Sequence, residues 1–291
     1  MKIFIAGTEG RWLFNVAVKH TRNLLHSAYF LEYRIRIDHR VQACNLLVDS
    51  GGYSARQHGH TIDVRDYAKF LNENDIKLAF NLDTNDPEET LRNQALLDAA
   101  CPRCKIIPVY HYSDFVDRRW RSLIDEYTEK YDFIATGGVA GASIPEEGLQ
   151  AFLRFVFSKT TDKVRVHGLG ITRVEVMLRY PFYSVDSTSW LAPMKWGTTR
   201  RRDGGIGTGK WLQFYVTEVP HKRRLHEELH HVMETEKYVT SIWKSRGVDW
   251  DARDADRAAP EPSKEGSMEL QEQREANAEG SGGKPSEERA G

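Results

Sequence analysis

The chain has 291 residues, of which 40% are hydrophobic and 29% charged, and its net charge is -1. This apolar fraction suffices for a large core and excludes a chain that is disordered throughout. No run of about 18 apolar residues is present, so we expect no transmembrane helix. The apolar part of MKIFIAGTEGRW is too short for a secretory leader. Three cysteines, a small and odd number, are typical of a reducing cytoplasm.

Short apolar runs alternate with segments of helical spacing along most of the chain. Strands are predicted at 2–7, 46–52, 77–83, 105–112, 132–138, 164–170, 182–186 and, as an eighth, 211–216. Helices are predicted at 63–74, 87–100, 114–131, 145–159 and 172–180. This alternation predicts parallel strands, and its repetition predicts an α/β fold of the (β/α)8 TIM-like barrel type. The stretch 10–45 fits the alternation less well.

The composition changes near the C-terminal end. From residue 252 onward there are 6 basic and 10 acidic residues and no aromatic residue. A segment rich in Glu, Ser, Gly and Pro cannot bury enough apolar surface to offset its chain entropy. We therefore expect a barrel over 1–250 and a disordered acidic tail over 251–291.

Polar residues stand at the ends of the predicted strands. In a barrel of parallel strands the carboxyl ends share one rim, where active sites lie. The rim residues expected from the strand ends are Asp49 to Tyr53, Asp83, Tyr110, His111, Gly137, Gly138, His167, Gly168 and Asp186. An aspartate after a strand is also a common turn former, and a histidine there is often only hydrogen-bonded. Three carboxylates on one rim nevertheless favour a functional site.

Four segments on this rim carry a pattern of motifs: DSGGYSA at 49–55, GGVAGAS at 137–143, VHGLGI at 166–171 and VDST at 185–188. In this order and spacing they resemble the tRNA-guanine transglycosylase superfamily, closest in kind to its DNA-modifying 7-deazaguanine members. The chain departs from the family at Ser54, where the family has glutamine, and lacks its Pro-Thr-Arg continuation after the catalytic strand. It also lacks the family's zinc motif, because no cysteine follows Cys104.

The resemblance implies roles for the carboxylates. Asp186 would be the nucleophile that displaces guanine from C1′ and holds the sugar covalently, as in retaining glycosidases. Asp49 would carry the proton to the departing base and from its replacement. Asp83 matches the base-recognition aspartate, which would accept hydrogen bonds from the N1–H and exocyclic amine of a guanine-like ring.

Further base contacts are expected from the side chains or backbone of Tyr53, Gly137, Gly138, Val139 and His167. Tyr53 could stack on the purine, and glycine lets the backbone approach the base edge. The plain alternatives are a core tyrosine at 53, a tight turn at 137–138 and a capping aspartate at 83.

Residues 195–224 carry 8 basic and 2 acidic side chains. This local excess could attract nucleic-acid phosphates, with Arg200, Arg201, Arg202 and Lys210 as the contacts. A solvated basic loop is the alternative. The run GGIGTGK resembles a P-loop, but Trp211 stands where Ser or Thr would hold magnesium, so no nucleotide binding is expected.

The function indicated by the resemblance is that of a pentosyltransferase, which exchanges guanine in DNA for a 7-deazaguanine base such as preQ0 or a derivative. The alternatives are exchange in tRNA, a catalytically silent nucleic-acid-binding partner subunit, and a hydrolase that releases the base to water. We expect no cofactor and no metal, and a free pair of thiols at Cys101 and Cys104. The expected location is the cytoplasm, or the host cytoplasm if the gene is phage-encoded.

Overall fold

The structure is a computed structural model of the whole chain. It describes residues 1–32, 37–84, 86–139, 144–160, 163–192, 194, 198–202, 211–215 and 221–258. The chain divides into two compact units, Met1–Val248 and Asp249–Gly291. In the second unit the described part contains the helix α12 (Trp250–Ala258), which lies in the segment expected to be disordered.

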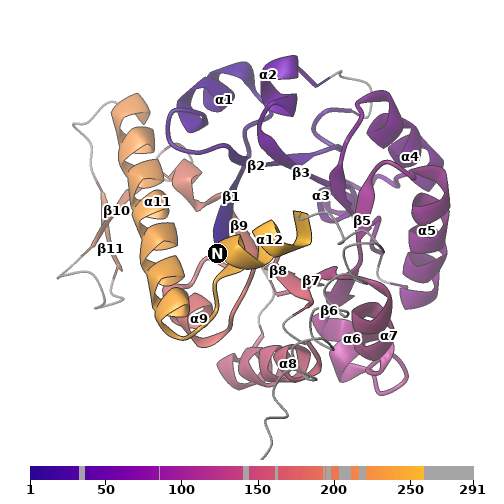
Figure 1. The fold of residues 1–291 in the computed structure, drawn as a ribbon. Helices are drawn as coiled ribbons and strands as arrows, with labels where there is room; N and C mark the ends of the chain where they lie inside the picture. Colours follow the sequence, from indigo (N-terminus) through magenta and orange to yellow (C-terminus); the bar gives the residue numbers. More distant parts are fainter. Residues whose placement is uncertain are drawn as a thin grey trace, which may run out of the picture. The chain divides into compact units, whose positions relative to one another are not determined.

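In its described residues the first unit is built on nine parallel strands arranged as a nearly closed barrel, with helices around it (Figure 1). The strands are β1 (Lys2–Ala6), β2 (Asn23–Ser27), β3 (Asn45–Asp49), β4 (Leu78–Phe80), β5 (Lys105–Ile107), β6 (Val109–His111), β7 (Phe133–Gly137), β8 (Arg165–Gly168) and β9 (Ser184–Ser187). Their order in the sheet is β5-β4-β3-β2-β1-β9-β8-β7-β6. The predicted TIM-like fold is thus confirmed.

The barrel closes at Pro108, which separates β5 from β6. Proline has no N–H to donate, which interrupts the strand between 105 and 111. The Asn81 N–H donates to Ile107 O at 3.0 Å, and the Ala135 N–H donates to Pro108 O at 2.9 Å. The carbonyls of Ile107 and Pro108, adjacent in the chain, therefore accept hydrogen bonds from opposite sides: Ile107 from the residue after β4, and Pro108 from β7. Counted as one strand, β5 and β6 give the eight-stranded arrangement that the sequence predicts.

The eighth strand predicted at 211–216 is wrong as a barrel strand. Residues Trp211–Tyr215 form β11, which pairs antiparallel with β10 (Thr198–Arg202) in a separate two-stranded sheet. The missing barrel strand is β2, which lies in the unassigned stretch 10–45. Its apolar part is only Leu24 and Leu25, too short a run to stand out in the sequence.

Helices follow most of the described strands along the chain. They are α1 (Arg11–Ala17), α2 (His39–Gln42), α3 (Gly52–Gln57), α4 (Val64–Glu73), α5 (Pro87–Ala100), α6 (Tyr112–Val116), α7 (Leu123–Lys130), α8 (Glu146–Lys159), α9 (Val174–Arg179) and α11 (His221–Ser245). The helix predicted over 114–131 is split into α6 and α7. Between them Asp117 accepts the Arg119 N–H at 3.0 Å, a local turn that competes with helix formation.

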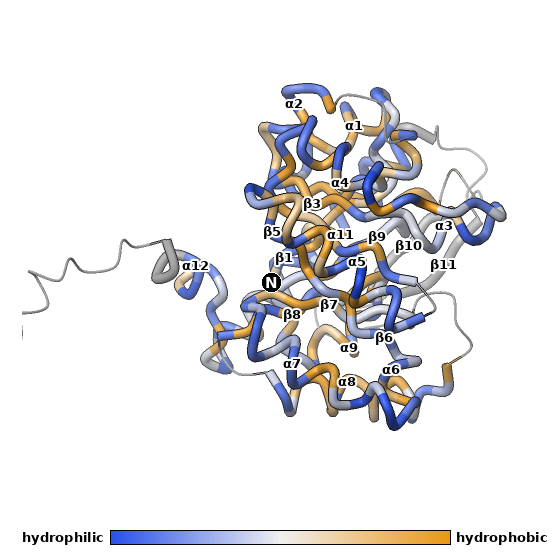
Figure 2. The backbone as a smooth tube through the Cα atoms, turned by 90° about the vertical axis from the view of Figure 1, so that its right-hand side faces the viewer, coloured by the Kyte–Doolittle hydropathy of each residue, from blue (hydrophilic) through white to orange (hydrophobic). Residues whose placement is uncertain are grey.

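The barrel interior is filled by side chains from strands that are not neighbours. The ring of His167 on β8 lies 6.0 Å from that of Phe4 on β1 and 4.9 Å from that of Phe80 on β4, measured between centroids. Figure 2 shows hydrophobic stretches among the barrel strands, as expected when both faces of a parallel sheet are covered. Among the described residues no helix has the length and apolarity needed to cross a membrane.

Candidate active site

The carboxyl ends of the barrel strands bring four carboxylates together on one rim. Asp49 ends β3 and Asp186 lies on β9, whereas Glu9 and Asp83 follow β1 and β4. Charges on Asp83, Asp186 and Glu9 all raise the pKa of Asp49, so each of the three lies within electrostatic reach of Asp49. Glu9 was not predicted from the sequence, because only the folded barrel brings it near Asp49 and no local sequence pattern marks it.

Asp49 has the most perturbed environment. Burial, reinforced by the neighbouring carboxylates, raises its pKa from 3.8 to about 7, although a hydrogen bond from the Gly51 N–H to its Oδ2 at 2.9 Å opposes the shift. Near neutral pH this carboxyl can therefore either donate or accept a proton. Gly51 makes the turn possible, because it has a φ of 80° and a Cβ there would lie 2.3 Å from Tyr29 Cβ.

Asp186 is held in place by two donors. The Gly170 N–H donates to its Oδ1 at 2.7 Å, and Nε2 of His167 lies 3.3 Å from the same oxygen. The other ring nitrogen of His167, Nδ1, is 2.8 Å from Ser184 Oγ. The Asp186 side chain is 13% exposed and that of His167 is 0% exposed. The described contacts of His167 therefore orient the carboxylate, rather than leaving the ring open to a base.

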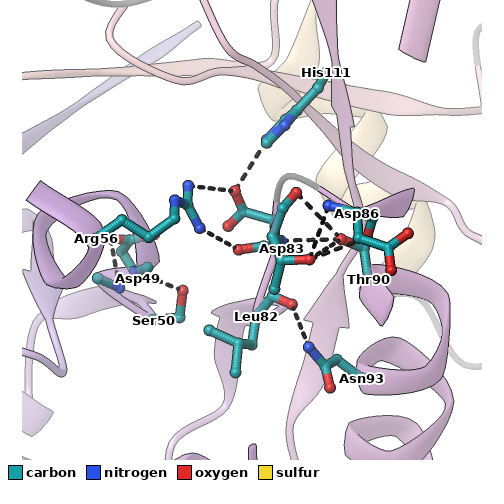
Figure 3. Close-up of polar contacts among 12 residues, drawn as sticks. Asp49, Ser50, Arg56, Leu82, Asp83, Asp86, Thr90, Asn93 and His111 are labelled. Atoms are coloured by element: carbon teal, nitrogen blue, oxygen red, sulfur yellow. Dashed lines mark hydrogen bonds and ion pairs between the residues drawn. The ribbon is translucent and has the colours of Figure 1, made fainter. Parts of the chain in front are cut away.

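Asp83 belongs to a charged cluster with His111 and Arg56 (Figure 3). Its Oδ2 lies 3.0 Å from His111 Nε2 and 3.9 Å from an Arg56 guanidinium nitrogen. Arg56 also donates to the backbone O of Asp83 at 2.9 Å. Burial by itself would raise the pKa of Asp83, but the hydrogen bond and charge of His111 and the charge of Arg56 outweigh it, so the pKa is lowered.

The same contact acts on His111. Burial would lower the pKa of its imidazole, but the hydrogen bond and charge of Asp83 outweigh burial, so the pKa is raised. Asp83 therefore stays ionised as an acceptor, and both side-chain contacts described for it use Oδ2. Arg56 lies on α3, one turn after the DSGG segment, and nothing in the sequence pattern singled it out.

Gly137 has a packing role that the sequence did not indicate. A Cβ there would lie 2.6 Å from His111 Cδ2 and 2.7 Å from Val109 Cγ1. Only glycine leaves room for the imidazole that holds Asp83. The neighbouring Gly138 is exposed and Val139 is half-buried, and the rest of the 137–143 segment lies outside the described residues.

Exposed aromatic side chains follow the strands on this rim. Tyr53, at the start of α3, is 60% exposed, which excludes the alternative of a core tyrosine. Phe30, after β2, is 54% exposed, and Trp12, in α1 after β1, is 44% exposed. Large apolar rings that face solvent beside a polar site offer surfaces for stacking.

The proposed phosphate contacts are only partly described. Arg200, Arg201 and Arg202 lie on β10, whose backbone alone the structure describes. Lys210 lies outside the described residues.

The chain matches no protein-family model, and a search of the curated proteins finds no match.

Proposed function

We propose that this protein is a base-exchange transglycosylase that replaces guanine in DNA with a 7-deazaguanine derivative through a covalent aspartyl–sugar intermediate. The observation that carries the proposal is the contrast between two carboxylates on one rim. Asp49 is half-buried among negative charges and has a pKa of about 7, whereas Asp186 accepts hydrogen bonds that hold it in place. Two carboxyl groups in such different environments suit one acid–base role and one nucleophilic role. The motif resemblance assigns them in the same way.

In the first half of the reaction, a carboxylate oxygen of Asp186 bonds to C1′ as the bond from C1′ to the guanine nitrogen breaks. The protonated Asp49 transfers its proton to the departing base, which leaves neutral, and Asp49 is left as a carboxylate. In the second half, Asp49 takes a proton from the incoming base, whose nitrogen bonds to C1′ as the ester to Asp186 breaks. Both aspartates return to their starting states, and two displacements retain the configuration of the sugar.

The reacting base would lie against Asp83. Its carboxylate is kept ionised by His111 and Arg56, as recognition of guanine N–H groups requires. The exposed ring of Tyr53 would stack on the base, and the backbone at Gly137, Gly138 and Val139 would approach its edge. The target nucleotide would leave its stack to reach this rim.

Exchange of radiolabelled guanine into DNA and into tRNA, run side by side, tests the proposal. We expect incorporation into DNA, its loss in Asp186→Ala, and its retention in Asp117→Ala, whose partly exposed carboxylate pairs with Arg119 at 2.7 Å. Incorporation into tRNA alone would reverse the choice of substrate. Release of guanine without exchange would identify a hydrolase, and nucleic-acid binding with neither reaction would identify a silent partner subunit.

A further inference from the structure

A cavity with several polar lining residues lies at the rim, and Glu9, one of the four carboxylates, lines it. It has a volume of about 150 Å³ and lies between the segment after β1, the end of β2, α1 and α2. Its lining includes Thr8, Glu9, Arg11, Phe14, His26 and Leu31, but none of Asp49, Asp83 and Asp186. A single water needs only about 10–15 Å³, so the cavity has room for a small ring.

His26 is the most deeply buried polar group of this cavity. His26 is 3% exposed, and its Nε2 lies 2.8 Å from Thr8 Oγ1. Its Nδ1 has no hydrogen-bond partner in the part of the chain that the structure describes. Burial lowers the pKa of His26 to about 4, so near neutral pH one ring nitrogen is a donor and the other an acceptor. A buried polar atom without a partner is costly, and a ligand would satisfy it.

Glu9 and Arg11 give the cavity a carboxylate and a guanidinium. Glu9 Oε1 accepts the Ser27 N–H at 2.9 Å, and within the described ranges no side chain donates to this carboxylate. Arg11 is exposed, whereas the neighbouring Arg40 is already paired with Asp38 at 2.9 Å. A carboxylate accepts N–H groups and a guanidinium donates to carbonyl oxygens.

Besides Thr8 and the paired Asp38 and Arg40, the other lining residues are apolar. Phe14 is 4%, Leu31 6%, Ile37 7% and Val41 7% exposed. Apolar walls with a few convergent polar groups are typical of small-molecule sites. Together they complement a flat ring whose faces are apolar and whose edge carries N–H and C=O groups.

The cavity is connected to the rim through Glu9. The residue that bonds to Glu9, Ser27, is paired with Asp49 in the β2–β3 register. The charge of Glu9 also reaches Asp49. A ligand in the cavity would therefore lie next to the reacting base without occupying its place.

We infer that this cavity binds a second nitrogen heterocycle of nucleobase type, recognised by Glu9, His26 and Arg11 through adjacent N–H and C=O groups. The inference rests on the proposed function for the kind of ring. The ring could come from the nucleotide that flanks the target or from a free base, because both present the same edge.

Equilibrium dialysis with radiolabelled 7-deazaguanine counts the sites. We expect two molecules bound per wild-type chain, and one in each of Glu9→Gln and Asp83→Asn, since each change removes one site. His26→Phe keeps the ring volume and should weaken the second site about tenfold or more. The control Glu88→Gln, whose side chain is 68% exposed on α5, should bind two molecules.

The inference would be overturned if the wild-type chain bound one molecule, and if that binding were lost in Asp83→Asn but kept in Glu9→Gln and His26→Phe. The cavity would then hold only water. The proposed function is tested separately, because guanine exchange can succeed or fail whatever the number of bound bases. Exchange into strands that differ only beside the target guanine identifies the source. If the wild type exchanges guanine at different rates in these strands and Glu9→Gln removes the difference, the cavity binds the flanking base. If Glu9→Gln keeps the difference but loses the second bound 7-deazaguanine, the cavity binds a free base.

Discussion

Replacing Asp49 by asparagine removes an ionisable group while keeping its shape and an oxygen that can accept the Gly51 N–H. In the folded wild type the Asp49 pKa is raised from 3.8 to about 7. A carboxyl whose folded-state pKa lies above its unfolded value stabilises the fold below the unfolded pKa. It loses that contribution as pH rises from the unfolded pKa through the folded pKa, because in this range unfolding releases a proton that the folded state still holds. Asp49→Asn does not lose stability in this way, because asparagine does not titrate.

The size of the effect follows from these two pKa values. Between pH 5 and pH 8 the free energy of unfolding of the wild type should fall relative to that of Asp49→Asn by about 2–3 kcal/mol. Urea unfolding followed by circular dichroism at both pH values measures this difference. Asp66→Asn, exposed on α4, is the matched control, with a change expected below about 0.5 kcal/mol. A difference for Asp49→Asn that stays constant with pH, or grows in favour of the wild type, would refute the reasoning.

Gly137→Ala should lower the free energy of unfolding by about 1–3 kcal/mol, because the new Cβ would overlap the ring of His111. In the same urea titration Gly10→Ala should change the free energy of unfolding little, because no atom lies within 4 Å of the Cβ added there. The opposite order of the two would contradict the packing described for His111. His167→Phe removes the ring nitrogen 3.3 Å from Asp186 and should slow guanine exchange about 10- to 100-fold without unfolding the barrel. An unchanged exchange rate would show that Asp186 needs no such orientation.

The residues that end the predicted strands identify most of the side chains on the rim. Asp49, Asp83 and Asp186 each close an apolar run, and a parallel barrel places such ends on one face whatever the details of packing. Their convergence could therefore be predicted from the sequence. The barrel strand β2 could not, because its two leucines stand between polar residues and its burial depends on β1 and β3.

The contacts that tune the site are tertiary and have no local pattern. Glu9 reaches Asp49 across β2, and Arg56 reaches Asp83 from another strand–helix unit. The role of Gly137 depends on the position of a histidine on a neighbouring strand, His111. The basic segment that includes Arg200 remains a prediction, since its side chains are not described.

In the central step of the proposed mechanism, Asp186 forms a bond to the sugar while Asp49 transfers the proton. Acid quenching of the wild-type protein with a guanine-containing DNA strand, followed by mass spectrometry of its peptides, tests this directly. The proposed mechanism predicts a sugar adduct on the peptide that contains Asp186, absent from Asp186→Ala. An adduct on a different residue, or base exchange that persists in Asp186→Ala, would contradict it.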